Sequence, residues 1–155
     1  MSRTVEKVEF RTCYKTELAT VIRGHHVYQN VWVAVIGEVL ETAPDGREEA
    51  KDYDKYAVGV YKKDILVGHI PVEISSLCYH FLQQDPENQI NAIITGKRKR
   101  EVGLVVPANL VFLTNIKTYS QILENELQKR KDKFPSVELI FKKKEVYRKF
   151  PHFSK

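Results

Sequence analysis

Long hydrophobic runs are absent from this sequence of 155 residues. The longest apolar stretch, residues 31–37, is too short to cross a bilayer, and the opening MSRTVEKVEF lacks the apolar centre of a signal peptide. We therefore expect an intracellular protein with no membrane association. At this length, with 43% hydrophobic and 29% charged residues, the chain should fold as one compact domain.

Cysteine is also scarce. Cys13 and Cys78 can form at most one bridge, and without a secretory signal both are expected to be reduced thiols. Neither has the spacing of a metal ligand. His25 and His26 are adjacent, so in a strand they point to opposite faces and cannot easily reach one metal ion. We expect no metal and no cofactor.

Enzyme signatures are missing as well. The sequence contains no GxGxxG, no P-loop, no GxSxG and no recognisable pair of catalytic carboxylates. The acids of DGREEAKDYD are expected to lie in a solvated loop. The prediction is a protein that is not an enzyme; a hydrolase assembled from distant residues is the minor alternative.

Positive charge is unevenly spread. Residues 128–155 hold ten lysines and arginines against three acids, a net +7, which leaves −2 on the other 127 residues. Such a basic end fits binding to a polyanion, and it is equally common in solvated tails. The run GKRKR at residues 96–100 has two similar interpretations: a hairpin tip that binds phosphates, or a charged edge that prevents strand pairing.

Strand patterns dominate the first third of the chain. VEKVEF, TELATVIRG and VYQNVWVAVIGEVLET are rich in β-branched and aromatic residues, with a turn expected at Gln29-Asn30 and a bulge or bend at Gly37. Pro44-Asp45-Gly46 then predicts a turn, because proline presets φ and glycine tolerates a positive φ.

The clearest unit follows this loop. YAVGVY and ILVGHIP are predicted strands joined by a KKD turn, and Pro71 suits the first turn of a helix. The helix is predicted over residues 71–84 and ends at Asp85-Pro86. Its apolar side chains recur at helical spacing, which predicts one buried face: Ile74, Leu77, Cys78, Phe81 and Leu82.

Beyond the helix, the strands QINAIITG and LVVPANLVFL enclose the basic connection KRKREVG. A second amphipathic helix is predicted over residues 116–131, then a strand at VELIF and a basic, aromatic end. Many short strands with one inserted helix indicate a mainly-β or α+β fold, a small curved sheet or partly open barrel. A doubly wound parallel sheet is disfavoured, since it needs helices between most strands.

Two adjacent residues before the YAVGVY strand, Tyr53 and Asp54, are the sharpest site candidates. Tyr53 is placed to stack on a base, or else it packs under the loop. Asp54 does not suit a phosphate binder, so it either accepts a hydrogen bond from a hydroxyl or amine, or it caps a turn.

Residues from Thr20 to Leu113 resemble the HIRAN domain, a module of certain SNF2-type translocases. The resemblance depends on the order and spacing of VIRGHHVY, KDYDKYAVGVY, VGHIPVEISSLC and PANLVFL. It implies a modified OB-like β-barrel with an inserted helix. We assign residues 1–113 to this barrel, with an N-terminal strand extension, and expect residues 114–155 to form a C-terminal helix and basic tail packed on the same domain.

The resemblance also implies a function, the capture of the 3′ end of single-stranded DNA. Tyr53 then stacks on the terminal base and Asp54 accepts from the terminal hydroxyl. The chain departs from the family at His26-Val27, where an Arg-Tyr pair is usual, and at Val72, where a lysine is usual. The expected nucleic-acid-binding residues are Tyr53, Asp54, His26, Tyr28, Lys97, Arg98, Lys99, Arg100 and Phe112.

We therefore predict a non-catalytic module that binds nucleic acid and prefers single-stranded DNA, within the cell and with the nucleus as a candidate location. The alternative is an adaptor for protein–protein interaction that keeps the fold without binding nucleic acid. Its partner is expected to dock on the C-terminal helix or the basic tail.

Overall fold

The computed structural model describes residues 6–24, 32–47, 54–101, 103–133 and 140–153. No helix among them is long and apolar enough to span a membrane. The strands and helices of these residues are β1 (Glu6–Ile22), β2 (Val39–Pro44), β3 (Val58–Lys62), β4 (Ile65–His69), α3 (Val72–Gln84), β5 (Gln89–Ile94), β6 (Lys99–Glu101), β7 (Gly103–Thr114), α4 (Lys117–Lys133) and β8 (Ile140–Phe153).

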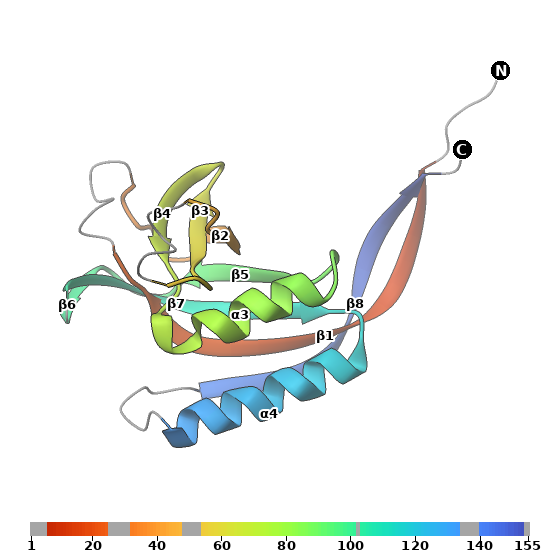
Figure 1. The fold of residues 1–155 in the computed structure, drawn as a ribbon. Helices are drawn as coiled ribbons and strands as arrows, with labels where there is room; N and C mark the ends of the chain where they lie inside the picture. Colours follow the sequence, from red (N-terminus) through yellow and green to blue (C-terminus); the bar gives the residue numbers. More distant parts are fainter. Residues whose placement is uncertain (1–5, 25–31, 48–53, 102, 134–139, 154–155) are drawn as a thin grey trace.

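The strands form one antiparallel sheet in the order β4-β3-β2-β5-β7-β1-β8, with β6 paired to β7 (Figure 1). The sheet curls until β1 meets β4, where Arg23 and His69 exchange two backbone hydrogen bonds of 2.9 Å. This seam closes six strands into a barrel. The expected mainly-β barrel with two helices is therefore confirmed, and it is consistent with a small OB-like fold.

The strand–turn–strand–helix unit is confirmed in order and position. β3 and β4 form a hairpin whose turn places Lys63 at a φ of 47°. Pro71 lies directly before α3, and Asp85 ends the helix in an extended conformation. Ile74, Leu77, Cys78 and Phe81 are buried as the spacing predicts, and Leu82 is partly buried against the same core.

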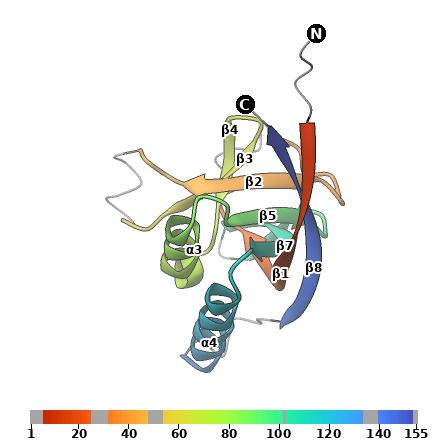
Figure 2. The same ribbon diagram turned by 90° about the vertical axis from the view of Figure 1, so that its right-hand side faces the viewer.

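The two helices lie on the same side of the sheet (Figure 2). α4 presents Leu123 and Leu127 to the core that α3 also covers, and both side chains are buried. The predicted amphipathic helix of residues 116–131 is thus present, although Ile116 lies just before its first turn and is partly exposed.

The structure of residues 32–35 differs from the prediction. The apolar run around Trp32 was expected to be a strand, but these residues belong to no strand of the sheet. Gly37, with a φ of 91°, instead turns the chain back so that the Glu38 amide donates to the Val35 carbonyl, and β2 begins at Val39. The expected turn at Gln29-Asn30 lies outside the described residues.

Pairing between distant segments lengthens the terminal strands. The patterns VEKVEF and TELATVIRG, expected as two strands, form the single strand β1 of 17 residues. β8 contains the predicted VELIF strand only in part, and it continues through the basic end as far as Phe153. β8 pairs with β1 from Ala19↔Ile140 to Glu6↔Phe153, and the two form a ribbon that extends beyond the barrel (Figure 1).

Candidate nucleic-acid interface

Three of the predicted site residues lie in two segments outside the described residues. His26 and Tyr28 belong to residues 25–31, and Tyr53 belongs to residues 48–53. Their roles stay predictions. The described residues on each side of 48–53 carry two of the acids that the sequence singled out, Asp45 and Asp54.

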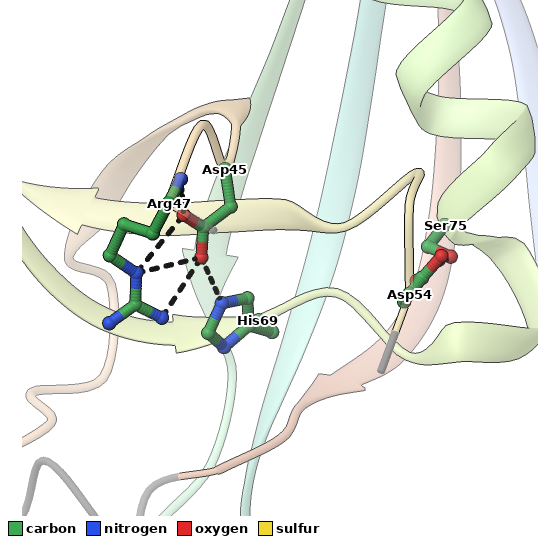
Figure 3. A network of polar contacts seen from close by, with 5 residues as sticks. All are labelled: Asp45, Arg47, Asp54, His69 and Ser75. Carbon is green, nitrogen blue, oxygen red and sulfur yellow. Dashed lines mark hydrogen bonds and ion pairs between the residues drawn. The ribbon is translucent and has the colours of Figure 1, made fainter. Parts of the chain in front are cut away.

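Asp54, the first described residue after 48–53, contacts α3. Its Oδ1 accepts a 2.9 Å hydrogen bond from the Tyr56 amide, and its Oδ2 lies 2.5 Å from the Ser75 hydroxyl (Figure 3). Ser75 is buried in the first turns of the helix. The carboxylate is therefore fixed between β3 and α3, and each of its oxygens keeps a second lone pair for another donor.

Asp45, on the other side of residues 48–53, differs from the expectation that the acids of DGREEAKDYD are solvated; Glu48, Glu49 and Asp52 lie outside the described residues. Its side chain has no exposed surface. The carboxylate accepts from the amide and guanidinium of Arg47 at 3.0–3.2 Å and lies 2.7 Å from His69 Nε2 on β4 (Figure 3). The described residues that flank 48–53 are thus held to β4 by Asp45 and to α3 by Asp54.

The pKa of Asp45 shows how well this carboxylate is compensated. Burial alone would raise its pKa, because the charged form loses its hydration. The hydrogen bonds from Arg47 and His69 and the charge of Arg47 outweigh burial and lower the pKa to about 2. Asp45 is therefore a charged anchor at neutral pH.

The sequence left two interpretations open for the basic run, a hairpin tip or a charged edge. The run does not lie at the tip of a hairpin. Lys99 and Arg100 lie in β6 and pair with Val105 and Leu104 of β7, while Lys97 lies in the connection from β5. We call residues 97–105 the basic hairpin. Because Ile22 pairs with Val106, this hairpin extends from the end of the barrel where β1 finishes (Figure 1).

The cations of the basic hairpin are accessible. Lys97, Arg98 and Lys99 are exposed, and within the described part of the chain Lys97 and Arg98 have no hydrogen-bonded or ionic partner. Arg100 is placed only by its backbone position in β6. Positive charge without protein partners is free to neutralise phosphates.

Phe112 does not fit the predicted stacking role. Its ring is fully buried near the C-terminal end of β7 and packs edge-on against Phe81, with ring centroids 5.4 Å apart. A base cannot reach a ring inside the core. Phe112 is therefore a core residue, because it lies on the inward face of β7 with Leu110 and Ala108.

An aromatic cluster beside Asp54 was not predicted. The Tyr56 ring lies 5.3 Å from that of Tyr79 and 4.9 Å from that of His80, and the Lys55 ammonium lies 5.0 Å from the centre of the Tyr56 ring. Tyr56 follows the Tyr53-Asp54 pair by two residues, which was the available signal. Its contact with α3 depends on packing that the sequence does not show.

No metal site accompanies these groups among the residues that the structure describes, where no three potential ligands cluster. Both cysteines are buried free thiols. Burial raises the pKa of the Cys78 thiol well above its usual range, despite the nearby charge of Arg130. These described thiols therefore contribute no reactive nucleophile to the interface.

Comparison with known proteins adds one match, at the level of the fold. No family model matches the sequence, and no curated protein matches it significantly. Among solved structures, the chain is similar to the crystal structure of the HIRAN domain of human HLTF, with a TM-score of 0.57 and 17% sequence identity. The match covers 76% of this chain and 92% of that one, so the chain has a HIRAN-like fold.

Proposed function

We propose that the chain is a non-catalytic module that binds nucleic acid at the end of the barrel from which the basic hairpin extends. The observation that carries the proposal is a pair of exposed cations, Lys97 and Arg98, which have no partner among the described residues and lie on a hairpin that projects from a HIRAN-like barrel. A basic projection beside a groove-forming barrel is a common arrangement for holding a phosphate backbone.

The preferred ligand in this proposal is single-stranded DNA, bound by its 3′ end. Tyr53 stacks on the terminal base, and Asp54 accepts a hydrogen bond from the terminal hydroxyl. The contacts of Asp54 with Tyr56 and Ser75 support this role, since they hold the acceptor in place before the ligand arrives. The proposal places the protein inside the cell, with DNA as its partner.

Fluorescence anisotropy with two labelled oligonucleotides tests end recognition. One oligonucleotide ends in a 3′-hydroxyl and the other in a 3′-phosphate, whose charge the Asp54 carboxylate repels. We expect the hydroxyl end to bind at least fivefold more tightly, and Tyr53→Ala to weaken binding about tenfold through lost stacking. Equal affinity for both ends, unchanged in Tyr53→Ala, would exclude end recognition.

Ser75→Ala serves as the matched variant for Asp54. It removes one contact of the carboxylate and leaves the carboxylate itself in place. Asp54→Ala should abolish the preference for the hydroxyl end, whereas Ser75→Ala should only reduce it. A preference that survives Asp54→Ala in a folded protein contradicts the role of this acid.

The salt dependence of binding tests the basic hairpin. Replacing Lys97 and Arg98 with glutamine should lower the slope of log K against log salt by about 1.4, since each phosphate contact on a single strand contributes about 0.7. Lys129→Gln with Lys131→Gln removes the same charge from α4 and should leave the slope unchanged. Identical slopes for the two double variants contradict a role for the hairpin.

Two other functions give different results in the same experiments. An adaptor that keeps the fold alone shows no oligonucleotide binding at low salt. A nuclease shows metal-dependent cleavage of DNA by the pure protein.

A further inference from the structure

The segment before β2 exposes a row of aliphatic side chains. Val33 is 76% exposed, and Val35, Ile36 and Val39 are each about 60% exposed. We call these four residues the aliphatic edge. Neighbouring exposed side chains of this size are uncommon in a soluble domain, and a continuous apolar patch generally marks a contact surface.

Two residues of this segment, Val33 and Ala34, also offer unused backbone hydrogen-bonding groups within the described part of the chain. Trp32 is buried and Ala34 packs against the core, while Val33 and Val35 point outward, which is the alternation of a strand. Within the described part of the chain, the amide and carbonyl groups of Val33 and Ala34 make no hydrogen bond. The segment therefore resembles a sheet edge that lacks its neighbouring strand.

The chemistry of the aliphatic edge favours a peptide over a nucleic acid. Bases bind to proteins by stacking on π faces, and the four exposed side chains are all aliphatic. The only tryptophan of the chain, Trp32, lies beneath them with its indole donating to Glu38. An extended peptide, in contrast, uses free backbone groups and alternate apolar side chains together.

The charge near the aliphatic edge defines the peptide further. Glu38 is neutralised by Lys62 at 2.7 Å. Ile94 holds the turn through hydrogen bonds with Gly37 and Glu38, and the chain then runs within four residues to the exposed Lys97 and Arg98. Since four residues of extended chain span at most about 14 Å, Lys97 and Arg98 lie near the Ile94 backbone that bonds to the turn within the aliphatic edge, and their positive charge favours an acidic ligand.

We propose that the aliphatic edge binds an extended segment of a partner protein that alternates aliphatic and acidic residues. The segment adds a strand beside residues 33–35, places its aliphatic side chains on the four exposed ones, and directs carboxylates toward the basic hairpin. Peptide binding at the aliphatic edge is a function in addition to the proposed binding of nucleic acid, and it does not depend on that binding.

Amide chemical shifts in ¹⁵N-labelled full-length protein test the proposal directly. The probes are ten-residue peptides that alternate glutamate with valine, isoleucine or leucine, and a matched set has proline in place of every second glutamate. At least one alternating peptide should shift the amides of residues 33–39 saturably, and its proline analogue should bind at least tenfold more weakly. If no peptide shifts these amides, or if the proline analogues bind equally, the proposal is wrong.

A matched pair of variants separates this surface from the others. Val33→Asn with Val35→Asn should weaken the peptide at least tenfold and leave oligonucleotide affinity unchanged, whereas Ile122→Gln on α4 should leave both unchanged. The wild-type shifts still locate the site if the double variant fails to fold. Self-association that depends on protein concentration and disappears in the double variant would identify the occupant as a second copy and overturn the proposal.

Discussion

At the scale of single residues, two carboxylates fix the described chain on either side of residues 48–53. Each of them contacts an element that follows it in the chain: Asp45 contacts His69, and Asp54 contacts Ser75. An acceptor that is already held in one position loses less conformational entropy when a ligand binds. The contacts of Asp54 therefore favour its proposed role.

The lowered pKa of Asp45 predicts a specific acid sensitivity. Because the folded-state pKa is about 2 and the ordinary value is 3.8, this group stabilises the fold above pH 4, and the contribution is lost as the pH falls toward 2. At about 1.4 kcal/mol per pKa unit, the loss is about 2 kcal/mol. Urea unfolding of the wild type and of Asp45→Asn between pH 2 and pH 5 measures it.

The variant should lack this part of the pH dependence and be about 2 kcal/mol less stable at pH 7. Glu41→Gln, which changes an exposed carboxylate on β2, should keep the wild-type profile. Parallel profiles for wild type and Asp45→Asn would contradict the role of this carboxylate.

Residue-level prediction from the sequence succeeded only in part where the cause is local. The Pro44-Asp45-Gly46 pattern predicts a turn with a positive φ at the glycine, but β2 continues to Pro44 and Gly46 has no positive φ. The Asp45 side chain nevertheless accepts from the amide two residues later, as an aspartate in a turn does. The burial of the same side chain depends on His69, 24 residues away, so the pattern could not show it. Phe112 was misplaced for a similar reason, because its inward direction is set by the register of β7 against β1 and β5.

At the scale of elements, the seam between β1 and β4 determines whether the sheet is a barrel or an open sheet. Two backbone hydrogen bonds between Arg23 and His69 form it. Gly68 makes the approach feasible: a Cβ there would lie 2.4 Å from Ile22 Cγ2 and 2.9 Å from the Arg23 carbonyl oxygen. The Arg23 backbone and the buried Ile22 side chain cannot both move away from such a Cβ.

Gly68→Ala should therefore destabilise the protein by about 1–3 kcal/mol and loosen the seam. Faster hydrogen exchange at the Arg23 and His69 amides, compared with those in the centre of β7, would identify the seam as the affected part. Gly46→Ala is the matched control, since nothing lies within 4 Å of its added Cβ. If both variants match the wild type in stability and exchange, the close packing at Gly68 is not a constraint.

Helices and strands that depend on residues nearby in the sequence could be predicted. Those that depend on pairing with a distant segment could not. The β3–β4 hairpin and α3 follow from strand alternation, a short turn, Pro71 and helical spacing within about 30 residues of sequence. Residues 32–35 have equally strong strand character, yet no neighbouring strand among the described residues pairs with them. Strand propensity reflects packing in a sheet, so it cannot reveal whether a partner strand is present.

For the molecule as a whole, α4 shares the hydrophobic core of the barrel. Leu123 and Leu127 belong to the same buried cluster as Leu18, Phe81 and Phe112. A sequence-based boundary near residue 113 therefore does not mark the end of the core. That all of residues 114–155 pack on the same domain as the barrel stays a prediction, which unfolding experiments test.

Leu127→Ala should cost about 2–5 kcal/mol, because it removes a fully buried side chain and leaves a cavity. If barrel and helix unfold together, far-ultraviolet circular dichroism and Trp32 fluorescence should move to the same lower midpoint in urea. Ile122→Ala on the exposed side of α4 should cost less than about 1 kcal/mol. A Trp32 transition that stays at the wild-type midpoint would show that the helix unfolds alone.

The ribbon of β1 and β8 has a consequence for engineering. Because Glu6 pairs with Phe153, the chain enters and leaves the described fold at one point (Figure 1). A segment with adjacent ends can be inserted into a surface loop of another protein without separating the two halves of its host. Residues 6–153 could thus be grafted as a cassette, with the two strands as its stalk.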